Sequence, residues 1–132
     1  MSPVGVSVGA MRDLRRARAG VAAVFFVNGA LFANLVPRLP DLKASLGMSN
    51  AELGMAVSAM PAGAVLAGLF APRLIRGMGS GRLASWGLVV LAAAFVLTGV
   101  VPSWPLLAAV LLVAGGVDAL VDVGQNAHGF RV

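Results

Sequence analysis

Hydrophobic residues form long runs along the chain, and charged residues interrupt these runs at only a few places. The longest run without a charged residue covers residues 83–117, which is too long for a single membrane span. It contains the segment "VPSWP" at residues 101–105, whose two prolines and serine indicate a turn. Each resulting segment is close to the roughly 20 residues that cross a hydrocarbon layer of about 30 Å. The pattern therefore predicts four spans, at about residues 19–37, 53–72, 83–100 and 105–126.

These four segments are expected to be helices. A backbone inside lipid must satisfy all of its hydrogen-bonding groups internally, and separate apolar segments of this length can do so only as α-helices. The predicted fold class is therefore an all-α integral membrane protein. Its expected organisation is a cytoplasmic N-terminal tail at residues 1–18, followed by a four-helix transmembrane region at residues 19–132.

Composition supports a membrane protein in contact with the lipid bilayer. Of the 132 residues, 59% are hydrophobic and 11% are charged, whereas soluble domains carry about 25% charged residues. The ten basic residues form no continuous stripe, and none lies between Lys43 and Arg73, so we expect no nucleic-acid partner. The absence of cysteine excludes disulfides, thiolate catalysis and cysteine-ligated metals.

The basic residues predict the orientation in the membrane. Two of them, Arg38 and Lys43, fall on one side of the four spans. The other eight fall on the opposite side, which the positive-inside rule assigns to the cytoplasm, so both termini are expected there. A basic segment before an apolar run also occurs in signal peptides, but residues 19–37 are long enough to span and end in a poor cleavage site. The eight residues are Arg12, Arg15, Arg16, Arg18, Arg73, Arg76, Arg82 and Arg131.

The fourth span carries a narrow polar stripe. At 100° per residue, Asp118, Asp122 and Gln125 fall within about 60° of one another, with Asn126 beside them. Asp118 lies about 20 Å along the helix from Pro105, past the middle of the membrane. A carboxylate at that depth must face a protein interior or a water-filled cavity. Asp118 and Asp122 are therefore candidates for proton coupling. The alternatives are a structural bond from Asp118 to Asn28 or to a backbone carbonyl, and solvation of Asp122 at the interface.

Two asparagines in the first span are further candidates. Asn28 and Asn34 are six positions apart and lie about 120° from sharing a face, so we expect at most one of them to line a polar interior. An asparagine within a span also commonly forms a hydrogen bond to a neighbouring helix. The candidate residues that line a solute path are Asn28, Asn34, Gln125 and Asn126.

Small residues recur every four positions in the second span and predict close helix packing. One row contains Gly54, Ser58 and Ala62, another contains Ala59, Gly63 and Ala67, and a third contains Ala64 and Gly68. Such rows allow helix backbones to approach closely within lipid. No metal cluster, catalytic constellation or phosphate-binding loop is recognisable, so we expect neither an enzyme nor a cofactor.

Residues 17–132 resemble the N-terminal part of a major facilitator superfamily transporter, of the bacterial sugar- and fucose-permease-like branch. The segment "FFVNGALFANLVPRLPDLKASLGMSNAELG" is similar to that branch's first helix and following loop. The segment "PRLIRGMGSGRL" is similar to the superfamily's signature loop, in which Arg76 replaces the usual acidic residue. The end of the fourth span matches an Asp-Val-x-x-Asn-Ala-x-Gly pattern with Asp122, Val123, Asn126, Ala127 and Gly129.

The resemblance implies a secondary transporter in the bacterial inner membrane. It implies transport of a sugar-like or other small polar solute, or a drug, with protons as the coupling ion, for example by symport. The gating-loop residues would be Leu74, Arg76, Gly79 and Arg82. Such a transporter has twelve helices, so we expect an incomplete N-terminal fragment that needs further helices or another subunit. The alternatives are an autonomous four-helix protein acting as a homodimeric small exporter, or a membrane interaction subunit.

Overall fold

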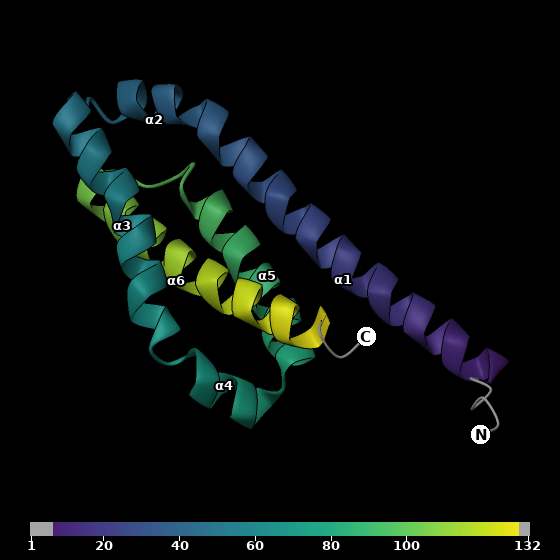
Figure 1. Ribbon diagram of the computed structural model, residues 1–132. Coiled ribbons are helices and arrows are strands. Elements are labelled where there is room, and N and C mark those ends of the chain that lie inside the picture. The colour runs from purple at the N-terminus through teal and green to yellow at the C-terminus, as the bar shows by residue number, and fades with distance from the viewer. Residues whose placement is uncertain (1–6, 130–132) are drawn as a thin grey trace.

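The computed structural model describes residues 7–129, and its regular secondary structure over that range is helical throughout. Figure 1 shows the helices as an elongated bundle in which α1 is the longest element. The all-α fold is therefore confirmed. The elements are α1 (Val8–Leu35), the 3-10 helix η1 (Val36–Arg38), α2 (Leu39–Ser45), α3 (Asn50–Gly68), α4 (Ala71–Met78), α5 (Ser80–Leu97) and α6 (Trp104–Gly129).

Within residues 7–129, four helical segments are long and apolar enough to cross a membrane, as expected. α2 and the connection between α5 and α6 lie at one end of the bundle (Figure 1). α4 and both ends of the described chain lie at the other end, so the path along the bundle is that of a four-span protein. Arg131, one of the eight basic residues assigned to the cytoplasm, lies outside the described residues. The four segments are Val8–Ser45, Asn50–Gly68, Ser80–Leu97 and Trp104–Ala127.

The first helix begins well before the predicted span. Ser7 caps it by accepting a hydrogen bond from the backbone N–H of Ala10 at 3.2 Å, so most of the expected tail is helical. The α-helix ends at Leu35, and a single 3-10 turn and then α2 follow it. Pro37 and Pro40 stand in the first turns of these two short elements. Proline is tolerated there because it lacks an N–H that would have no partner.

A tight turn and a capping box connect α2 to α3. Gly47 has φ 61°, a conformation that glycine adopts without strain. The Ser49 hydroxyl accepts a hydrogen bond from the Glu52 N–H at 3.2 Å, and the Glu52 carboxylate accepts one from the Ser49 N–H at 2.7 Å. Both bonds satisfy N–H groups that the first turn of a helix leaves without partners.

We expect Ser49→Ala to lower the free energy of unfolding by about 1 kcal/mol, because it removes one of these two capping bonds. Denaturant titration in detergent, followed by far-ultraviolet circular dichroism, measures this change. Ser45→Ala is the matched control, since the Ser45 hydroxyl bonds only the Leu42 carbonyl at the end of α2. The prediction is contradicted if both variants unfold at the same denaturant concentration.

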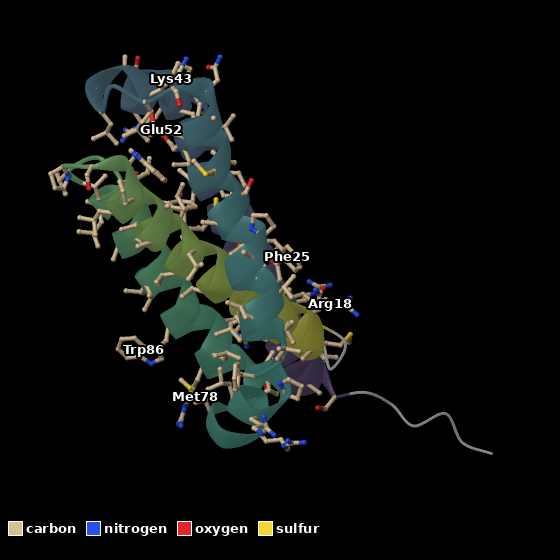
Figure 2. The ribbon with its side chains drawn as sticks, turned by 90° about the vertical axis from the view of Figure 1, so that its left-hand side faces the viewer. Arg18, Phe25, Lys43, Glu52, Met78 and Trp86 are labelled. Atoms are coloured by element: carbon tan, nitrogen blue, oxygen red, sulfur yellow. The ribbon has the colours of Figure 1, made fainter. Side chains whose placement is uncertain are left out.

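α6 lies at the centre of the bundle. It packs extensively against α3 and α5, while α1 makes sparser contacts with α5 and α6. The core contains Leu91, Leu107 and Leu111, none of which is more than 1% exposed. Outward-facing side chains are large and apolar: Phe26 is 77% exposed and Trp86 is 65% exposed. Figure 2 shows Trp86 pointing away from the bundle. An apolar outer surface is what a lipid-embedded bundle requires.

Glycine allows α3 and α6 to touch through their backbones. A Cβ atom on Gly63 would overlap with the Leu112 carbonyl of α6, and one on Gly115 would overlap with the Met60 carbonyl of α3. Only the predicted row of Ala59, Gly63 and Ala67 faces inward, whereas Gly54, Ser58 and Ala62 are exposed. This contact holds α6 against α3 and so contributes to the position of the polar stripe, which lies on another face of α6.

The signature-like segment is more ordered than the expected loop. α4 covers Ala71–Met78, so Leu74 and Arg76 lie on a short helix. Gly79 is the single residue between α4 and α5, and its φ of 84° suits glycine. Arg82 follows in the first turn of α5, and both Arg76 and Arg82 are exposed at the end of the bundle that carries α4.

Candidate functional site

The polar residues predicted in the spans meet between α1 and α6. α1 supplies Asn28, which is only 8% exposed although Phe25, Phe26 and Val27 beside it are open. α6 supplies Asp118, Asp122 and Gln125, which share a face because they are separated by one helical turn. We call these four residues the polar cluster.

Hydrogen bonds connect the four side chains in series. The Asn28 amide nitrogen donates to Asp118 Oδ1 at 3.0 Å and to Asp122 Oδ1 at 3.4 Å. The Gln125 amide nitrogen donates to the same oxygen of Asp122 at 3.2 Å. Asn28 therefore bridges two carboxyl groups from a different helix. The bond from Asp118 to Asn28, one of the alternatives that the sequence left open, is present.

Two amide oxygens in the polar cluster have no hydrogen-bond partner among the described residues. They are Asn28 Oδ1 and Gln125 Oε1, and both are buried. Each amide must turn its nitrogen toward the carboxyl groups, because its oxygen would be repelled by them. Buried polar groups are normally paired, so two orphan acceptors in one cluster require an explanation.

The two carboxyl groups also lack a positively charged partner in the described part of the chain. No described basic side chain forms an ion pair with Asp118 or Asp122. The arginines of α1 all precede residue 19, and Arg82 lies in the first turn of α5. Acidic residues within a membrane span normally pair with another group or line a solvated pathway.

A cleft of about 200 Å³ lies beside the polar cluster, between α1, α5 and α6. Its wall is mostly small and apolar, and Gln125 and Ser85 are its polar residues. Gln125 belongs to both the cleft and the polar cluster, and Asn28 lies one helical turn beyond Val24 on the same face of α1. The sequence carried no signal for Ser85, because a single serine is common in any helix. The lining includes Gly20, Val21, Val24, Ala84, Ser85 and Gln125.

The other predicted lining residues do not join the polar cluster. Asn34 is exposed, and its amide nitrogen donates to the Ala30 carbonyl of its own helix at 2.9 Å. Asn126 is exposed beside Gln125. Their role as solute-lining residues stays a prediction. The gating-loop residues lie at the end of the bundle. Leu74 and Arg76 lie within α4, Gly79 forms the turn, and Arg82 lies in the first turn of α5.

Two rhizobial proteins are similar to the chain. It is 28% identical over 122 residues to an uncharacterized transporter, y4wD, of Sinorhizobium fredii, a match covering 92% of the chain and 32% of that protein. It is 28% identical over 106 residues to the membrane protein MosC of Rhizobium meliloti, covering 80% of the chain and 26% of that protein. No family model and no solved structure matches the chain.

The chain spans about a third of the length of the first relative and about a quarter of the second. Its four candidate spans agree with the relatives' names as a transporter and a membrane protein. Together these findings support a multi-pass membrane protein.

Proposed function

We propose that the chain forms four helices of a secondary transporter of the major facilitator type, which moves a small polar solute in exchange for, or together with, protons. The observation that carries this proposal is the polar cluster. Asp118 and Asp122 lie within an apolar helix, and a single amide from α1 joins them. A partly buried carboxyl pair of this kind can take up and release a proton as its solvation changes.

Movement of α1 would change that solvation. α1 contacts the rest of the bundle sparsely, whereas α3, α5 and α6 form a closely packed unit. A shift of α1 would carry Asn28 away from both acids at once, because Asn28 donates to both. Alternating access works through such rearrangements of helices around a site near the membrane centre. The affinity of Asp118 and Asp122 for protons would then depend on the position of α1.

The proposed location is the bacterial cytoplasmic membrane with both termini inside. The distribution of arginine supports this orientation, because α4, which carries Arg73 and Arg76, and the start of α5, which carries Arg82, lie at the same end of the bundle as the two ends of the described chain (Figure 1). Lys43 lies at the opposite end, as Figure 2 shows. Further helices or another subunit would complete the solute path, as the relatives' greater length suggests.

We expect Asp118→Asn and Asp122→Asn each to reduce proton-coupled solute movement at least tenfold, because asparagine keeps the shape of aspartate but cannot exchange a proton. The measurement uses vesicles that contain the chain together with the helices or subunit that complete the solute path, and a trapped pH-sensitive dye follows proton movement when a solute panel is added. Initial rates are compared at a fixed pH gradient.

Asp41→Asn is the matched control, since Asp41 is an exposed acid of α2 outside the membrane core. Proton movement that is unchanged in both Asp118→Asn and Asp122→Asn would remove the coupling role. Solute movement that ignores the pH gradient in the wild-type chain would remove proton coupling altogether.

A further inference from the structure

The polar cluster offers a ligand hydrogen-bond acceptors more than donors. Asn28 uses its amide nitrogen on both acids, and Gln125 directs its nitrogen to Asp122. What remains is the second oxygen of each carboxyl group and the two buried amide oxygens without partners. Oxygen atoms of this kind accept hydrogen bonds, so a complementary ligand must bring N–H or O–H donors.

The charge of the cluster selects among such ligands. Asp118 and Asp122 form no ion pair with any described basic side chain. Residues 19–35 of α1, 53–68 of α3 and 83–97 of α5 contain no charged residue. The charged residues of these three helices are Arg12, Asp13, Arg15, Arg16, Arg18, Glu52 and Arg82. A positively charged ligand would offset the carboxylates, and charge-assisted hydrogen bonds are about twice as strong as neutral ones.

An ammonium group fits this site better than a metal ion. Hard cations such as Ca²⁺ need about six or more oxygen ligands, and the described residues contain no group of three His, Cys, Asp or Glu side chains that could hold a metal. An ammonium group carries up to three N–H donors, and each can bond one oxygen at about 2.8 Å. The neighbouring cleft of about 200 Å³, with its apolar wall, has room for a small organic body.

We propose that the polar cluster binds the ammonium group of a small amine solute, and that this cation competes with protons for Asp118 and Asp122. This inference rests on the proposed transport function and names its solute class. Protonation removes the negative charge that holds the ammonium group, so one carboxyl pair does not hold both ligands well. Proton uptake on one side of the membrane would release the amine there, which couples the two in opposite directions.

The test measures binding without requiring transport. The chain in detergent is heated with ethanolamine hydrochloride, with ethylene glycol plus KCl, or with NaCl, all at equal ionic strength. Ethanolamine and ethylene glycol share a two-carbon body and a hydroxyl group, and only the former carries an ammonium group. We expect ethanolamine alone to raise the unfolding temperature, with a shift that grows with the logarithm of its concentration. The shift should shrink as the pH is lowered and vanish in Asp118→Asn and Asp122→Asn, but persist in Asp41→Asn.

Several outcomes would overturn the inference. An equal shift with ethylene glycol would show that the ammonium group is irrelevant, and a shift with NaCl but not ethanolamine would identify a metal-ion site. A shift independent of pH would remove the competition. These comparisons use the wild-type chain, so they remain decisive if an aspartate variant fails to fold. Amine binding without proton-driven movement would contradict the proposed function but not this inference. Proton-driven movement of neutral solutes alone would contradict this inference but not the proposed function.

Discussion

Gly63→Ala is expected to lower the free energy of unfolding by about 3 kcal/mol, the upper end of the range for overpacked cores. The added Cβ atom would overlap with the Leu112 carbonyl of α6, which is backbone and cannot rotate away. α3 and α6 would have to separate along their contact. The change is measured by denaturant titration in detergent, with helix content followed by circular dichroism.

Gly54→Ala is the matched control within the same helix. A Cβ atom on Gly54 meets no atom within 4 Å, so alanine there should be neutral or should stabilise α3 through its higher helix propensity. Gly115→Ala should repeat the loss seen in Gly63→Ala, because its Cβ atom would overlap with the Met60 carbonyl from the other side of the contact. Similar stability of Gly63→Ala and Gly54→Ala would show that the helices do not touch there.

The same crossing explains how the polar cluster is positioned. α6 is confined on its other side too, because a Cβ atom on Gly124 would lie 2.9 Å from the Ser80 carbonyl of α5. Gly124 is adjacent to Gln125 and two residues from Asp122. Close backbone contact with α3 and α5 therefore fixes the rotation of α6 about its axis. The stripe of Asp118, Asp122 and Gln125 is held toward α1 as a result.

The spans could be predicted from the sequence because the bilayer imposes one dominant pattern, a long run without charges. The start of α1 could not, because Arg12, Arg15 and Arg16 are good helix formers but unfavourable in lipid. Hydropathy therefore ends the span near residue 19, whereas backbone propensity carries the helix back to Val8. α4 could not be predicted either, because a helix of eight residues is too short to show a clear helical period, and Gly77 and Gly79 indicate a turn there.

The candidate site was predictable in its residue types and less so in its contacts. The stripe on α6 followed from helical periodicity alone. The choice between Asn28 and Asn34 did not, because both are amides on one helix and only packing against α6 separates them. The small-residue rows of α3 pose the same problem, since three rows are equally small and one of them meets α6. Periodicity identifies faces of a helix, but it does not say which face a neighbour covers.

Asn28→Leu should lower the free energy of unfolding by about 2–3 kcal/mol, because it removes a donor shared by two partly buried carboxyl groups. Leucine has the same branched skeleton as asparagine but bulkier end groups, so the matched leucine control and the double-mutant cycle below separate the packing contribution from the hydrogen bonds. Denaturant titration measures it as for the glycine variants. Asn34→Leu, on the same helix, is the matched control, and should change stability by less than about 0.5 kcal/mol since Asn34 is exposed and bonds its own backbone.

A double-mutant cycle with Asp118→Leu separates the hydrogen bond from other effects of these changes. Replacing both partners by apolar residues removes the unpaired polar groups that each single change leaves behind. The double variant should therefore lose less stability than the sum of the two single losses, by about 1–3 kcal/mol. Losses that simply add would mean that Asn28 and Asp118 do not interact. In that case a movement of α1 would not change the surroundings of Asp118 through Asn28, and the proposed link between helix movement and proton binding would be contradicted.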